Sequence, residues 1–233
     1  MIYSKDYYEE QFLEYPVKDI FKTVGEQNYK GPWLKYIGGE PYVIDDKTAT
    51  NGKCLRLECK LVNDKPQTTA IWTRNNVEFP DGTIEVRARF KGACSSWPAI
   101  WMTSKNEDKT KQYEIDLCEY FGKRRWWCKT GIFMPKHLKW GLRRLFRPKK
   151  HPRIKMHDWN IFKCSWDEKE IKIYVNGKKV LTYKNKGNED QYPQTFTSRC
   201  FCLILSMQYG HGYERWKQLP AWMDIDYVKY ISK

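Results

Sequence analysis

The sequence predicts an all-β protein, an antiparallel sandwich of short strands. Runs with an apolar residue at every second position recur along the chain, and the clearest is 83–90. Turn signals such as Pro80-Asp81-Gly82 and Asn176-Gly177 separate the runs, and helical periodicity is scarce. Many short alternating runs with turns between them are typical of a sandwich rather than of an α/β fold.

The first 40 residues are expected to be irregular, because Pro16, Gly31 and Pro32 break any long element. Strands are then expected at 54–59, 69–73, 83–90, 113–120, 162–166, 170–175, 180–183, 201–207 and 223–231. In 83–90 the residues Ile84, Val86, Ala88 and Phe90 line one face, and Glu85, Arg87 and Arg89 line the other. The apolar run 201–207 predicts a strand covered on both faces. No repeat or boundary divides the chain, so 1–233 is expected to be a single domain.

The composition points to a partner with flat or anionic surfaces. Aromatic residues make up 16% of the chain, and the formal net charge is +14. Aromatic faces suit the stacking of sugar rings or bases, although they also suit sheet surfaces. An excess of positive charge favours nucleic acid, an anionic membrane or an acidic polysaccharide. The eight cysteines form no CxxC pair, so a zinc ribbon is not expected and most are expected to be free thiols.

The segment 113–120 carries the chemistry. On a strand, Glu114 and Asp116 share a face, and strict alternation would place Cys118 there next. A β-bulge at 117–118 would insert one residue and bring Glu119 to that face instead. Like charges this close resist simultaneous ionisation, and a retaining glycosidase needs one ionised and one protonated carboxyl group close together. The alternative is an acidic edge that is simply solvated.

Glu-Ile-Asp-Leu-Cys-Glu at 114–119 resembles the bulged active-site signature of family-16 glycoside hydrolases, which include laminarinases, agarases, porphyranases and carrageenases. Further segments resemble the family in the same order: 82–90, Ser-Trp-Pro-Ala-Ile-Trp-Met at 96–102, 159–177, 203–205 and 223–230. The resemblance runs from about residue 50 to the end. It implies a β-jelly-roll sandwich of the concanavalin A-like kind, with a concave substrate cleft.

By position in that signature, the resemblance implies Glu114 as nucleophile, Asp116 as its helper and Glu119 as acid/base. The implied activity is retaining endo-hydrolysis of β-1,3 or β-1,4 linkages in a galactan or glucan, sulfated or otherwise anionic in one version of the hypothesis. The same carboxylates would serve a transglycosylase. A carbohydrate-binding protein that kept the fold without the chemistry is a further alternative, although all three acids are present.

Trp97 and Trp101 are expected near the cleft floor, where the alternative is plain core packing. The other predicted substrate-binding residues are Trp72, Arg124, Arg125, Trp126, Gln208 and His211. Many laminarinase-like members carry a histidine on the strand after the catalytic one, where this chain has Phe133, and this puts the usual glucans in doubt. Some members hold calcium with an acid of the last strand, and Asp226 fits that position as a possible metal ligand. No other cofactor is expected.

The segment 123–155 holds 13 Lys or Arg residues and no acid, and is expected as a basic insertion at the cleft rim. It could bind sulfate or carboxylate groups of a polysaccharide, or be a solvated insertion. Residues 136–147 could instead form a short amphipathic helix that contacts a membrane surface. No nucleic-acid motif accompanies the charge, so nucleic acid is not an expected partner. The protein is expected to be a monomer. The family works outside the cell, so an extracellular or periplasmic location is expected. Because the first residues do not resemble a signal peptide, a trimmed sequence or a phage-type protein would explain the start.

Overall fold

The computed structural model describes residues 7–14, 20–25, 36–93, 95–104, 112–122, 126–133, 148–187, 192–195, 197–210 and 218–233. Its strands, in chain order, are β1 (Tyr7–Glu10), β2 (Lys22–Thr23), β3 (Tyr42–Asp45), β4 (Lys53–Val62), β5 (Lys65–Gln67), β6 (Thr69–Trp72), β7 (Gly82–Lys91), β8 (Ser96–Ser104), β9 (Glu114–Glu119), β10 (Lys129–Phe133), β11 (Lys149–Lys150), β12 (Asn160–Trp166), β13 (Glu170–Val175), β14 (Lys178–Lys184), β15 (Phe201–Tyr209) and β16 (Ala221–Ser232). A 3₁₀ turn, η3, spans Thr197–Arg199.

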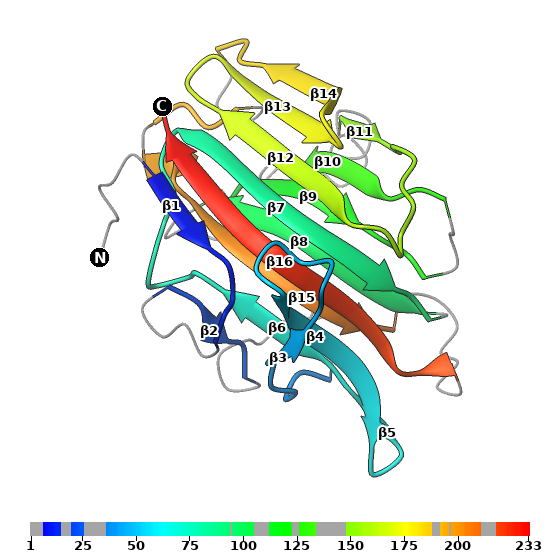
Figure 1. Ribbon diagram of the computed structural model, residues 1–233. Helices are drawn as coiled ribbons and strands as arrows, with labels where there is room; N and C mark the ends of the chain where they lie inside the picture. The colour runs from blue at the N-terminus through cyan, green and yellow to red at the C-terminus, as the bar shows by residue number, and fades with distance from the viewer. Residues whose placement is uncertain are drawn as a thin grey trace.

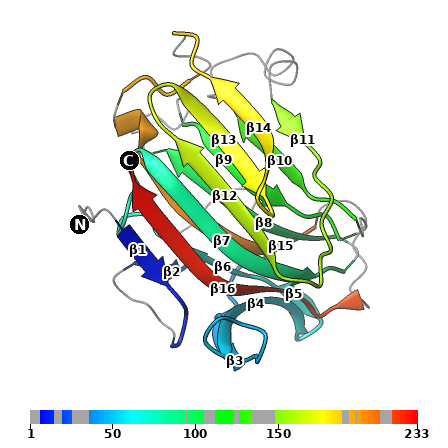
Figure 2. The same ribbon diagram turned by 45° about the horizontal axis from the view of Figure 1, so that its top comes forward.

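These strands form two antiparallel sheets that lie face to face (Figures 1 and 2). Within the described ranges, sheet A has nine strands in the order β14-β13-β12-β7-β16-β4-β3, with β1 beside β16 and β5 beside β4. Sheet B has seven strands in the order β11-β10-β9-β8-β15-β6-β2. The predicted all-β sandwich is therefore confirmed.

One hydrophobic core fills the space between the sheets, and the alternation of β7 explains why. Ile84, Val86, Ala88 and Phe90 are all buried in that core, as the period-two pattern predicts. The run 201–207 lies within β15, whose nine residues are all buried. β15 lies in the middle of sheet B, with the core on one face and the side chains of β6 and β8 packed around its residues on the other face. Both faces are therefore covered, and no residue of the strand is exposed.

The hairpin between β13 and β14 turns at Asn176 and Gly177, with φ angles of 50° and 76°. Two consecutive positive φ values are the mark of a two-residue turn that matches strand twist, and Asn-Gly is its preferred sequence. The hairpin predicted from that dipeptide is thus confirmed.

The first 40 residues are not wholly irregular, which corrects the expectation for that segment. β1 pairs with β16 from Tyr7↔Ile231 to Glu10↔Val228, and β2 pairs with the end of β6. Backbone pairing to strands more than 45 residues away makes these elements, so local sequence carries no signal for them. Within the same segment Val24 and Ile37 are buried against Ala70 and Trp72 of β6.

Part of the basic segment 123–155 is sheet rather than insertion, because β10 pairs with β9 and β11 pairs with β10. The predicted helix at 136–147 lies outside the described residues. Among the residues that the structure describes, no helix is long and apolar enough to cross a membrane. No disulfide joins the cysteines of the described part of the chain.

Candidate active site

β9 contains the predicted bulge. On one side Ile100 pairs with Cys118 and Trp101 pairs with Asp116, so two steps along β9 match one step along β8. On the other side Lys129 pairs with Glu119 and Gly131 with Asp116, so three steps match two. The extra residue lies between Asp116 and Cys118, which is the register shift of a β-bulge.

The bulge sorts the side chains of β9 into two sets. Ile115, Leu117 and Cys118 belong to the core between the sheets. Strand alternation then places Glu114, Asp116 and Glu119 on the opposite face of sheet B, which we call the carboxylate face. Asp116 and Glu119 are 3% and 5% exposed, while Glu114 is half-buried. Two consecutive core residues, Leu117 and Cys118, are what bring Glu119 to this face.

Cross-strand pairing shows which side chains adjoin the three acids. Across β8, Thr103 lies opposite Glu114, Trp101 opposite Asp116, and Ala99 opposite Glu119. Across β10, the partners of the same acids are Phe133, Gly131 and Lys129. Directly opposed residues have Cβ atoms about 5 Å apart, so these side chains, and the bare backbone at Gly131, adjoin the acids.

Lys129 is the functional candidate that the sequence reasoning missed. Its Nζ forms an ion pair with Glu119 Oε2, and its side chain is largely buried. The ammonium also lies over the rings of Phe121 and Phe133, 5.7 and 5.6 Å from their centroids. In the sequence Lys129 is one of the thirteen basic residues of the segment 123–155, which contains no acid. Only the strand pairing that places it opposite Glu119 distinguishes it from the others.

Trp101 is half-buried on the carboxylate face and donates its indole N–H to Ser206 Oγ at 3.2 Å. Ser206 also accepts from Gln208 Nε2 at 2.9 Å. Ser206 therefore fixes the orientation of the Trp101 ring, a role that no sequence pattern indicated.

Gln208 is 3% exposed and lies opposite Trp97 in the register of β15 and β8. Its Oε1 is buried without a hydrogen-bond partner among the described residues. A buried acceptor without a partner is costly, so Gln208 is held at this position at some cost in stability. Trp97 is half-buried and stacks on Phe121 with centroids 5.6 Å apart.

The other predicted binding residues have different surroundings. Trp72 is 6% exposed and pairs with Ile204, which in turn pairs with Trp101, so it lies on the carboxylate face beside Trp101, in a small apolar cluster with Val24 and Ile37. Trp126 is exposed and lines a hollow described below. Arg124, Arg125 and His211 lie outside the described residues.

Cys118 packs directly behind the acids. Burial raises the pKa of its thiol well above the usual value, and the neighbouring Cys128, Glu119 and Asp116 raise it further. The group therefore stays a neutral thiol and acts as a small apolar residue.

The surroundings of Asp226 do not fit a calcium ion. Its carboxylate accepts from Thr50 N at 2.9 Å and Thr50 Oγ1 at 2.7 Å, and it forms an ion pair with Arg87. Arg89 likewise bridges Asp46 and Asp224. Guanidinium groups thus already supply the positive charge that these carboxylates would otherwise take from a metal.

Comparison with known proteins identifies the family. Residues 43–229 match the family model described as Glycosyl hydrolases family 16. The chain belongs to glycosyl hydrolase family 16. Among curated family relatives, it is 27% identical to a keratan-sulfate endo-1,4-beta-galactosidase of Sphingobacterium multivorum, over 84% of this chain and 48% of that protein. It is 24% identical to glucan endo-1,3-beta-glucosidase A1 of Niallia circulans, over 67% of this chain and 25% of that protein.

The chain therefore spans about half, or less, of the length of these curated relatives. Solved structures match it over nearly their whole length. The laminarinase from Flavobacterium sp. UMI-01 gives a TM-score of 0.77 at 21% identity, covering 97% of this chain and 99% of that one. The laminarinase catalytic domain of Thermotoga maritima MSB8 gives 0.76 at 21%, covering 98% and 99%. These likenesses confirm the predicted jelly-roll sandwich of family 16.

Proposed function

We propose that the protein is an endo-acting glycoside hydrolase that cleaves a β-linked galactan or glucan with retention of configuration. The observation that carries the proposal is the placement of Glu114, Asp116 and Glu119 on one face of β9, which the bulge makes possible. Carboxylates beside aromatic rings are what this reaction needs, because it requires a nucleophile, an acid and a surface for sugar rings.

In the proposed reaction Glu114 attacks the anomeric carbon while Glu119 donates a proton to the glycosidic oxygen. The C–O bond breaks, the leaving chain departs with that proton, and a glycosyl ester forms on Glu114. Glu119, now a carboxylate, takes a proton from water, whose oxygen attacks the anomeric carbon and releases Glu114. Asp116 lies between the two along β9 and is placed to orient Glu114.

The strand spacing of the two glutamates allows retention. With the bulge residue discounted, Glu114 and Glu119 are four strand positions apart, about 13 Å between Cα atoms. Two glutamate side chains that lean toward Asp116 shorten this gap toward the ~5–5.5 Å that retaining enzymes use.

Several features bear on the substrate. One matched relative is named for keratan sulfate and another for a β-1,3-glucan. Lys129 places a cation directly beside Glu119, and Phe133 lies opposite Glu114. Because Lys129 is paired with Glu119, its charge is offset, and both sulfated and neutral polymers are candidates for the carboxylate face.

The test is a reducing-end assay on keratan sulfate, desulfated keratan sulfate, agarose and laminarin, with NMR detection of the anomeric configuration of the first product. Glu114→Gln should lower the rate at least about 10³-fold, since a nucleophile is lost outright. Glu168→Gln removes an exposed glutamate in the β12–β13 turn and should leave the rate unchanged. Full activity in Glu114→Gln would refute the assignment. Binding of a polymer without cleavage by the unaltered protein would instead favour a carbohydrate-binding protein.

A further inference from the structure

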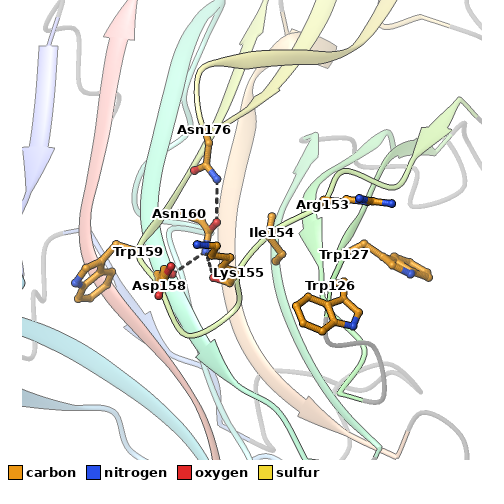
Figure 3. Close-up of a pocket in the computed structure, with 9 residues that line it drawn as sticks. All are labelled: Trp126, Trp127, Arg153, Ile154, Lys155, Asp158, Trp159, Asn160 and Asn176. Atoms are coloured by element: carbon orange, nitrogen blue, oxygen red, sulfur yellow. Dashed lines mark hydrogen bonds between the residues drawn. The ribbon is translucent and has the colours of Figure 1, made fainter.

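A hollow of about 770 Å³ lies outside the carboxylate face, and none of the residues that surround the three acids lines it. Three segments form it: Trp126 and Trp127 before β10, residues 153–160 leading into β12, and the turn at Asn176 (Figure 3). The proposed reaction makes no use of it.

Trp126 is 69% exposed, which makes it the most exposed of the large apolar side chains in the described ranges. Folding alone gives no reason to leave an indole in water, since burying it would be favourable. In Figure 3 its ring turns toward the segment that carries Ile154 and Lys155. An exposed indole at the wall of a hollow is a surface on which a flat ring can stack.

The base of the hollow is held by backbone pairing. Ile154 N donates to Trp126 O at 3.0 Å, and Cys128 N donates to Pro152 O at 3.2 Å. The ring of Trp127 meets His151 edge-on, with centroids 4.6 Å apart. The two tryptophans are thus presented by paired backbone rather than by a free loop.

The opposite wall is fixed by two amides. Asn176 Nδ2 donates to Asn160 Oδ1 at 2.9 Å, and Asn160 Nδ2 donates to the carbonyl oxygens of Lys155 and Asp158 at 2.9 and 2.7 Å. These amides are occupied within the protein. Polar contacts to a ligand therefore fall to the side chains of Arg153, Lys155 and Asp158.

Arg153 and Lys155 are exposed on either side of the buried Ile154, so alternation puts both cations on the outer side of this segment. Within the described residues neither side chain makes an ion pair or hydrogen bond. Arginine suits bidentate contact with sulfate or carboxylate, and lysine adds a point charge. Asp158 lies at the Trp159 end of the hollow, where a carboxylate accepts bonds from sugar hydroxyls but repels a uniformly charged polymer.

The hollow adjoins one end of the carboxylate face. Trp127 precedes Lys129 by two residues, about 7 Å along an extended backbone, and Lys129 contacts Glu119. A chain that leaves the carboxylate face past Glu119 therefore has this hollow within the length of a few sugar units.

We propose that the hollow is a second binding site for an anionic polysaccharide, one that carries sulfate or carboxylate groups on a pyranose backbone. Trp126 stacks on a sugar ring, and Arg153 and Lys155 bind the anionic substituents. The identity of the polymer rests on the proposed function, but binding at this site does not require cleavage.

Binding is measured by affinity electrophoresis and calorimetry on protein carrying Glu114→Gln, so that the polymer stays intact, with keratan sulfate and its desulfated form at 150 mM salt. Adding Trp126→Ala should weaken binding of keratan sulfate about tenfold, equivalent to about 1.4 kcal/mol. Adding Arg153→Ala and Lys155→Ala should do the same, and should affect the desulfated form much less. The matched control, Lys53→Ala with Lys65→Ala, removes the same charge from exposed positions on β4 and β5 and should change binding less than about twofold.

Equal affinities for the Trp126 variant and the control would overturn the proposal. So would a Trp126-dependent preference for single-stranded DNA over keratan sulfate, which would assign the hollow to nucleic acid. Because Trp126 is exposed, the variant should keep the melting temperature of the parent, and Trp126→Tyr should retain most of the binding. If the unaltered protein cleaves no polysaccharide but Trp126-dependent binding persists, the proposed function fails while this site stands.

Discussion

Deletion of Leu117 tests what cleavage depends on. The alternatives are the face of β9 on which the three acids lie and the number of residues between them in the sequence. Leu117 is the extra residue of β9 against both neighbouring strands. When it is deleted, Asp116 is followed by Cys118 and then Glu119, so regular alternation points Cys118 to the core and keeps Glu119 on the carboxylate face. Glu119 also stays opposite Ala99 and Lys129.

The expected cost is in stability. Leu117 is fully buried in the core, and loss of a buried leucine typically costs about 2–5 kcal/mol. For a domain of this size each 1 kcal/mol lowers the melting temperature by about 2–4 °C, so a decrease on the order of 10 °C is expected. The rate of polysaccharide cleavage below that temperature should stay within about tenfold of the parent. A tenfold change corresponds to about 1.4 kcal/mol in the activation free energy, which is the most that we expect a small displacement of Glu119 to cost.

Deletion of Ile115 is the matched control. Ile115 is equally buried in the core, so its loss should lower stability by a similar amount. With Glu119 and Asp116 held by their partners, this deletion turns Glu114 toward the core and should abolish cleavage. Calorimetry gives the two melting temperatures, and reducing-end release at 20 °C gives the two rates. Equal inactivation of both variants, with both folded by circular dichroism, would refute the reasoning.

Two further predictions concern stability. Asp224 is fully buried and accepts four N–H bonds from Arg56 and Arg89 at 2.7–3.1 Å. Asp224→Asn should lower the free energy of unfolding by about 3 kcal/mol, whereas the exposed Glu168→Gln should lower it by less than about 0.5 kcal/mol. Equal values for the two variants in urea unfolding would contradict this prediction. Burial raises the pKa of the Cys54 and Cys59 thiols to about 12 from 9.0. Because the unfolded chain ionises first, their contribution to stability is complete below pH 9 and is lost as the pH rises toward 12. Urea unfolding at pH 8 and pH 10.5 measures this loss, and Cys54→Ser with Cys59→Ser should flatten it.

Local sequence predicted what depends on local rules. The alternation of β7 and the turn at Asn176-Gly177 follow from side-chain period and backbone preference. The row of acids was found in the same way, because a bulge is the one local device that unites Glu119 with Glu114 and Asp116.

What the sequence did not predict depends on contacts between distant segments. β1 exists because β16 offers its edge, and Lys129 matters because the register places it opposite Glu119. The hollow at Trp126 needs three segments that only the folded sheets bring together. Each of these residues has an unremarkable local setting, so periodicity and composition cannot separate it from its neighbours.

Two of the bulges in the described strands, those of β9 and β16, follow from one rule. In β9, Leu117 and Cys118 are consecutive and both belong to the core, so the strand must slip by one residue to bury both. In β16 the register shifts between Ile225 and Tyr227, and there Asp226 and Tyr227 both contact outward partners, Arg87 and Glu85. Two like residues in succession within an alternating strand therefore predict a bulge, and their polarity predicts the face they share. In β9 the two consecutive residues are apolar and are both buried in the core. The packing of the core is therefore what turns Glu119, the proposed acid/base, toward the substrate.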